Sequence, residues 1–165
     1  MKKRIAFHTL GCKLNQYETD SLASQFRRAG YEIVPFEGQA DCYVVNSCTV
    51  TNRADRKTRN TVNRALRRAG ERLYTPSHSE TVTAVATLPE AAEKDAIVVL
   101  TGCFVDSHKQ SDRATGATYL VDNKRKSRIF SIVDGHFRGE VVDPDSLDPA
   151  IFQFDAPQRI FHTRT

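Results

Sequence analysis

The sequence predicts an α/β domain built on a doubly wound parallel sheet, and three observations support this fold class. Short apolar segments alternate with amphipathic helical segments, which is the pattern of βαβ units. Two segments, 41–46 (DCYVVN) and 96–101 (AIVVLT), contain continuous apolar runs, as expected for strands covered on both faces. The 165 residues, 39% hydrophobic and 27% charged, suit one globular domain with its own core.

The individual elements follow from periodicity and end signals. The apolar run 4–9 predicts a first strand. The segment 15–29 predicts a helix, because Leu22 and Phe26 lie one turn apart and Gly30 is a stop signal. The remaining expected elements are strands at 31–34, 41–46, 96–101 and 119–122, and helices at 52–69 and 126–133. We expect the strand order 2-1-3-4-5, which is flavodoxin-like.

Two segments do not fit this alternation. Residues 71–95 are too long for a helix-to-strand connection, where about 2–6 residues are typical, and predict a surface insertion. Residues 139–165 contain three prolines and apolar side chains with no evident core to join. We therefore expect one domain over 1–138, followed by a linker toward a further domain that this chain does not contain.

Charge and hydropathy narrow the class of protein. The formal net charge of +4 permits a nucleic-acid partner without requiring one. The apolar stretch near the N-terminus is too short for a signal peptide. No segment approaches the roughly 20 apolar residues of a membrane span. We expect a cytoplasmic protein that does not act at a membrane.

Three of the four cysteines follow predicted strands. Cys12, Cys48 and Cys103 come just after the strands at 4–9, 41–46 and 96–101, respectively. The carboxyl ends of neighbouring parallel strands, spaced about 4.8 Å apart, share the sheet edge where ligands bind. Cys42 lies early in its strand and is predicted to be a core residue. The sequence therefore predicts three thiols at one edge, in a compartment where disulfides are rare.

The three thiols suit metal binding. Helix N-termini beside Cys12 and Cys48 favour the thiolate, and the glycines before Cys12 and Cys103 leave room for a bulky inorganic ligand. Three thiolates with one position open suit an iron–sulfur cluster. A zinc site, with His8 as a candidate fourth ligand, and three unrelated buried thiols are the alternatives. A phosphatase-type nucleophile at Cys12 is disfavoured, because no arginine follows in its loop.

At these motifs the chain resembles a known family. The segments TLGCKLNQYETD, YVVNSCTVTNRADRKTR and VVLTGC closely resemble the N-terminal domain of the methylthiotransferases, which are radical S-adenosylmethionine enzymes. The segments Lys13-Leu14-Asn15 and Glu18-Thr19 are most similar to those of the branch that adds a methylthio group to threonylcarbamoyladenosine at tRNA position 37. The branches acting on isopentenyladenosine or on a ribosomal protein are the alternatives.

The resemblance implies particular roles for residues. Cys12, Cys48 and Cys103 would bind an auxiliary 4Fe–4S cluster, whose open iron carries the sulfur or methylthio group. The side chains expected around that cluster are Asn15, Glu18 and Asn46. The resemblance assigns no catalytic residue to this chain.

The resemblance also implies parts that these 165 residues lack. The family continues into a domain whose CxxxCxxC motif holds a second 4Fe–4S cluster that cleaves S-adenosylmethionine. No CxxxCxxC occurs in this sequence. We therefore expect the chain to be inactive alone and to need a radical S-adenosylmethionine domain in cis or in trans. A function of a different class stays open, namely a non-catalytic flavodoxin-like module that binds zinc or an iron–sulfur cluster.

A basic segment is the candidate tRNA surface. Arginine and lysine make most contacts with nucleic-acid phosphates. The candidate residues for contact with the anticodon region of tRNA are Arg53, Arg56, Lys57 and Arg59. The alternative is a solvated helix face, in which Asp55 pairs with Arg59 one turn away.

Overall fold

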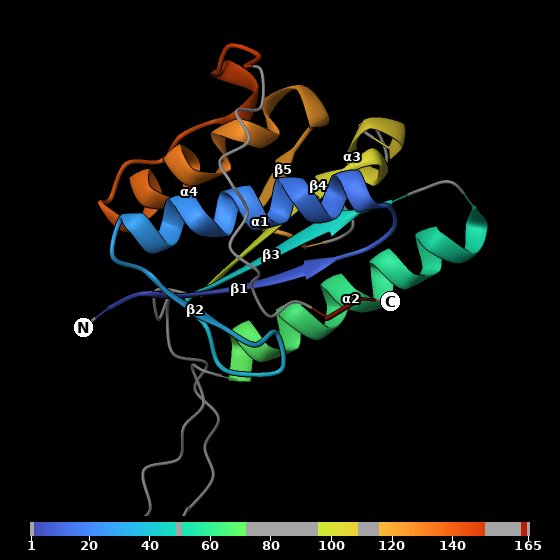
Figure 1. The fold of residues 1–165 in the computed structure, drawn as a ribbon, viewed down its shortest axis with the longest axis horizontal. Helices are drawn as coiled ribbons and strands as arrows, with labels where there is room; N and C mark the ends of the chain where they lie inside the picture. The colour runs from blue at the N-terminus through green and yellow to red at the C-terminus, as the bar shows by residue number, and fades with distance from the viewer. Residues whose placement is uncertain (1, 49–50, 72–95, 109–115, 151–162, 165) are drawn as a thin grey trace, which may run out of the picture.

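A computed structural model describes residues 2–48, 51–71, 96–108, 116–150 and 163–164. Its parallel sheet has the order β2-β1-β3-β4-β5, which confirms the predicted flavodoxin-like arrangement (Figure 1). The strands are β1 (Arg4–Thr9), β2 (Glu32–Val34), β3 (Cys42–Ser47), β4 (Ile97–Gly102) and β5 (Tyr119–Val121). A further two-residue strand, β6 (Thr163–Arg164), pairs with β1 at His8 and Thr9.

Helices cover both faces of the sheet (Figure 1). One face carries α1 (Lys13–Arg28) and α4 (Ile129–Phe137), and the other carries α2 (Asn52–Glu71). Three short helical segments complete the described elements: α3 (Cys103–His108), and the 3₁₀ helices η2 (Asn123–Arg128) and η3 (Pro144–Ser146).

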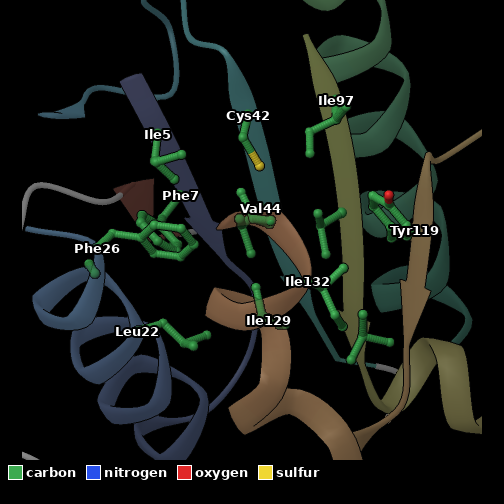
Figure 2. Close-up of a cluster of buried hydrophobic side chains, with 14 residues drawn as sticks. Ile5, Phe7, Leu22, Phe26, Cys42, Val44, Ile97, Tyr119, Ile129 and Ile132 are labelled. Atoms are coloured by element: carbon green, nitrogen blue, oxygen red, sulfur yellow. The ribbon is translucent and has the colours of Figure 1, made fainter. Parts of the chain in front are cut away.

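Alternation along each strand divides the core into two layers. Ile5 and Phe7 of β1 face α1 and α4, whereas Ala6 between them faces α2. In the first layer, Phe26 of α1 and Ile129 of α4 are fully buried against the strands (Figure 2). Each such side chain contributes about 1.5–3 kcal/mol relative to an exposed position. This packing fixes α1, and with it the loop that carries Cys12, against the sheet.

Cys42 belongs to this layer. Its side chain is completely buried and points into the cluster in Figure 2, which confirms the prediction that it is a core residue. Burial, with a smaller contribution from the Asp41 carboxylate, raises the pKa of the Cys42 thiol far above its ordinary value of 9.0. The thiol is therefore protonated in the folded protein at any physiological pH.

We expect this burial to make stability fall in alkali. Above pH 9 the unfolded chain loses the Cys42 proton and the folded chain keeps it, so the free energy of unfolding decreases as pH rises. Tyr31 and Tyr119, whose pKa values are also raised mainly by burial, act in the same direction at higher pH. Urea denaturation between about pH 8 and 10 measures the effect. Cys42→Ala should flatten the pH dependence, and an unchanged slope in that variant would contradict the account.

The C-terminal part of the sheet differs from expectation. The closing helix predicted over 126–133 is present as α4, but its bounds differ, because the chain first forms η2 and then α4 from Ile129 to Phe137. The Asp122 carboxylate accepts a hydrogen bond from the Arg125 backbone N–H at 2.9 Å, which starts a tight turn directly after β5. This local cap places η2 at the carboxyl edge of the sheet.

The two segments that do not fit the alternation are described only in part. The expected insertion, 71–95, is described only at Glu71, where α2 ends. Within the expected linker, 139–165, Val142 and Leu147 pack against the first core layer. No helix among the described residues is both long and apolar enough to cross a membrane.

Candidate metal centre

The structure places the three strand-end cysteines at one edge of the sheet. Cys12 is the residue before α1, Cys48 directly follows β3, and Cys103 is the first residue of α3 after β4. The strands β1, β3 and β4 are adjacent and in parallel register. Cys12 and Cys103 are exposed, whereas Cys48 is 8% exposed. The prediction that these loops share an edge is therefore confirmed.

Two glycines make the turns into the cysteine loops. Gly11 has φ +98° and Gly102 has φ +102°, a left-handed backbone conformation that other residues rarely adopt. A Cβ at Gly11 would lie 2.9 Å from the Cys48 sulfur, and one at Gly102 would overlap backbone atoms of Ser47. Glycine thus lets the loops that carry Cys12 and Cys103 approach the end of β3.

Ser47 joins the ends of two strands next to Cys48. Its hydroxyl donates to the Thr101 carbonyl at 2.6 Å and accepts from the Phe104 backbone N–H at 3.2 Å. Ser47 therefore fixes the start of α3, where Cys103 lies, relative to β3.

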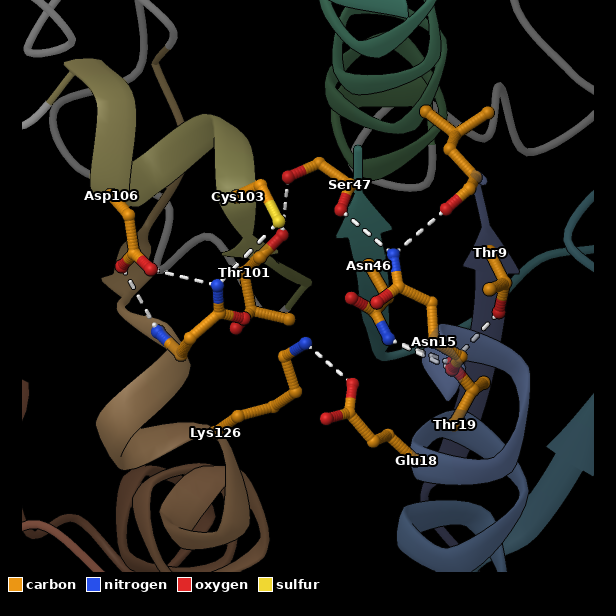
Figure 3. A network of polar contacts seen from close by, with 12 residues as sticks. Thr9, Asn15, Glu18, Thr19, Asn46, Ser47, Thr101, Cys103, Asp106 and Lys126 are labelled. Atoms are coloured by element: carbon orange, nitrogen blue, oxygen red, sulfur yellow. Dashed lines mark hydrogen bonds and ion pairs between the residues drawn. The ribbon is translucent and has the colours of Figure 1, made fainter. Parts of the chain in front are cut away.

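Asn15 links the other two loops (Figure 3). Its side-chain amide donates to the Leu10 carbonyl at 2.9 Å and to the Ser47 carbonyl at 3.0 Å. The Asn46 amide in turn donates to the Asn15 carbonyl at 3.0 Å and to the Thr19 hydroxyl at 3.2 Å. Both asparagines are buried, and their amides hold the residues that flank Cys12 and Cys48 in place.

Glu18 has a partner that sequence reasoning missed. Its carboxylate lies 2.6 Å from the ammonium of Lys126, and the two side chains are 14% and 2% exposed. The pair joins α1 to η2 below the cysteine edge (Figure 3). No local sequence signal indicates that Lys126 meets a carboxylate 108 residues away.

His8, near the end of β1, is a buried residue. Its side chain is 1% exposed and packs on Phe36, with ring centroids 4.9 Å apart. Phe36 belongs to the core layer on the α2 side of the sheet. The structure therefore packs His8 on the α2 side of the core.

The three cysteine sulfurs are suitable ligands for a metal, but they are not arranged as a finished metal site. Among the described residues, no three His, Cys, Asp or Glu side chains are placed so that they could hold one metal ion. Three thiols at one sheet edge are nevertheless the soft ligands that iron–sulfur clusters and zinc prefer.

An open pocket of about 230 Å³ adjoins Cys48. Its lining is Leu10, Gly11, Cys48, Thr51, Arg53, Ala54 and Lys57. Two basic residues at the start of α2 therefore lie beside the most buried of the three thiols.

The basic residues of α2 fall into two groups. Arg53, Arg56 and Lys57 are exposed near the cysteine edge. Farther along the helix, the guanidinium groups of Arg64 and Arg68 lie over the Phe36 ring, and Arg68 also donates to the Phe36 carbonyl. Arg59 lies 5.1 Å from the centre of the Phe104 ring. The second half of α2 thus uses its arginines to pack on its own domain.

Comparisons with known proteins agree with this arrangement. Residues 4–75 match the model of the family described as Uncharacterized protein family UPF0004. The chain is 33% identical over 131 residues to the threonylcarbamoyladenosine tRNA methylthiotransferase MtaB of Bacillus subtilis, covering 79% of this chain and 24% of that relative. This chain belongs to the methylthiotransferase family.

Two further relatives also match the chain over only part of their own length. The MtaB protein of Aquifex aeolicus is 35% identical over 132 residues, which are 79% of this chain and 26% of the relative. The ribosomal protein uS12 methylthiotransferase RimO of Alteromonas mediterranea is 33% identical over 72 residues, which are 44% of this chain and 15% of the relative. The chain thus spans about a quarter of the length of the MtaB relatives.

Proposed function

We propose that this chain is the cluster-bearing domain of a tRNA methylthiotransferase. Cys12, Cys48 and Cys103 would hold one auxiliary 4Fe–4S cluster. The observation that carries the proposal is their position after three adjacent parallel strands. When bound, the cluster would supply one iron without a cysteine ligand as the carrier of the sulfur to be inserted.

The residues around the cysteines would prepare the site without contributing ligands. Asn15 holds the Leu10 and Ser47 carbonyls, so it fixes the spacing of the loops that carry Cys12 and Cys48. The Lys126 ammonium compensates the negative charge of the Glu18 carboxylate. An uncompensated carboxylate near three thiolates would repel them. A cluster ligated by thiolates carries negative charge, so this pairing favours its binding.

The substrate we propose is threonylcarbamoyladenosine in tRNA. The MtaB relatives are 33% and 35% identical over 79% of this chain, whereas the RimO relatives reach 33% identity over only 44% of it or 23% identity over 84% of it. Higher identity over most of the chain favours the tRNA branch over the ribosomal-protein branch. Cleavage of S-adenosylmethionine, with its second 4Fe–4S cluster, would take place on a separate radical domain supplied in cis or in trans.

Metal analysis of protein purified and reconstituted without oxygen tests the cluster. About four irons and four sulfides per chain, with a brown colour, would support the proposal. About one zinc per chain in colourless protein would instead support a zinc-binding module without catalysis. Metal-free protein after reconstitution would contradict both.

We further propose that the start of α2 contacts tRNA. Arg53 and Lys57 line the pocket beside Cys48, and Arg56, which lies between them in the sequence of α2, is exposed. Phosphate contacts there would hold the anticodon region close to the cluster. Arg59 lies over Phe104 and would contribute at the margin of this surface.

We expect the double variant Arg53→Ala/Lys57→Ala to bind an unmodified tRNA transcript about tenfold more weakly at low salt. Each phosphate contact releases counterions from the RNA and so favours binding, and the variant loses two such contacts. The slope of log affinity against log salt should fall by nearly two. Filter binding at several salt concentrations measures both quantities. Arg27→Ala/Arg28→Ala removes the same charge from the far end of α1 and serves as the matched control. An equal loss in the two double variants would contradict a localised surface.

A further inference from the structure

The η2 helix contacts the sulfur of Cys103. The Asn123 side-chain amide lies 3.7 Å from the Cys103 sulfur and donates toward it (Figure 3). Cys103 is the first residue of α3, and Asn123 is the first residue of η2, directly after β5. The contact therefore joins the loops that follow two neighbouring strands.

Asp106 holds the Asn123 amide in this orientation. One oxygen of its carboxylate accepts from the Asn123 side-chain amide at 2.7 Å, and the other accepts from the Asn123 backbone N–H at 3.1 Å. Asp106 lies one turn after Cys103 on α3, so both residues lie on the same side of the helix. The carboxylate uses one amide hydrogen, and the second hydrogen is directed at the sulfur.

The neighbouring turn of η2 is anchored in the core. Lys126, three residues after Asn123, is 1% exposed and forms its ion pair with Glu18 of α1. The Asp122 carboxylate caps the same helix at Arg125. Asn123 is thus presented from a segment fixed on both sides, although its own side chain is exposed.

We propose that Asn123 is a positioning residue that orients the Cys103 sulfur and donates a hydrogen bond to it when the sulfur binds the cluster. The inference rests on the proposed function, because it requires a cluster on Cys103. Hydrogen bonds to cluster sulfurs stabilise the more negative, reduced state and so raise the reduction potential. Asn123, held by Asp106, would keep the third ligand in place and ease reduction of the cluster.

The test is a redox titration of the reconstituted 165-residue chain, followed by its visible absorbance. Asn123→Ala should load the same amount of iron and show a lower midpoint potential than the wild type. The cluster of this variant should also be lost faster to a chelator. Asn123→Gln keeps an amide donor and should restore part of the potential. Asn63→Ala, which removes an exposed asparagine from α2, should leave the potential unchanged.

The outcomes separate the two proposals. A wild-type chain that binds no iron overturns the cluster assignment and this inference together. A loaded wild-type chain whose potential is matched by Asn123→Ala overturns the inference alone. A purely structural role for Asn123 predicts a lower melting temperature with no change in potential, which also overturns it. A lowered potential in Asn123→Ala with partial recovery in Asn123→Gln supports it.

Discussion

Lys126→Met is expected to lower the free energy of unfolding by about 3–5 kcal/mol, since removing one partner of a buried ion pair leaves the other charge uncompensated. The Lys126 side chain is 2% exposed, and the Glu18 carboxylate that would lose its partner is 14% exposed. The pair also joins α1 to η2, so its loss would loosen two elements that flank the cysteine edge.

Urea denaturation of metal-free protein measures this effect apart from any cluster. Arg138→Met is the matched control, because it breaks an ion pair with Asp134 whose side chains are 61% and 27% exposed. An exposed pair contributes about 0–1 kcal/mol. The double variant Lys126→Met/Glu18→Leu should recover stability relative to Lys126→Met, because it leaves no buried charge. A loss in Lys126→Met no larger than that in Arg138→Met would contradict the buried-pair account.

Cys48→Ala is expected to abolish cluster binding while leaving the fold intact. Cys48 is the most buried of the three strand-end thiols and lies against Gly11, between the loops that carry Cys12 and Cys103. Two thiolates cannot replace three, so the iron content should fall from about four per chain to less than about one. Cys48→Ala removes only one sulfur atom at the edge of the core, so its melting temperature without metal should stay close to that of the wild type.

The edge that carries the cysteines could be predicted from the sequence because the signals for it are local. Apolar runs mark the strands, Gly30 marks the end of α1, and the parallel order follows from alternation of the elements. Cys12, Cys48 and Cys103 each stand just after a strand, so their shared edge followed from the strand order. Packing that depends on one face of a strand, as for Cys42, could be predicted for the same reason.

The contacts that shape the site could not be predicted in this way. Glu18 and Lys126 are 108 residues apart, and Cys103 and Asn123 are 20 residues apart on different elements. The hydrophobic periodicity of a sequence does not indicate which polar side chains from different elements meet at a sheet edge. Asn15 shows the same limit. The family resemblance predicts that it lies near a cluster, whereas the hydrogen bonds of its amide to two backbone carbonyls became evident only in the folded chain.

The most direct test of the central claim is the iron and sulfide content of the four single cysteine variants after anaerobic reconstitution. The account predicts about four irons per chain in the wild type and in Cys42→Ala. It predicts less than about one iron per chain in Cys12→Ala, Cys48→Ala and Cys103→Ala, each of which lacks one of the three ligands. Full iron content in any of those three variants, or an equal loss in all four, would contradict the assignment of the strand-end cysteines as the cluster ligands.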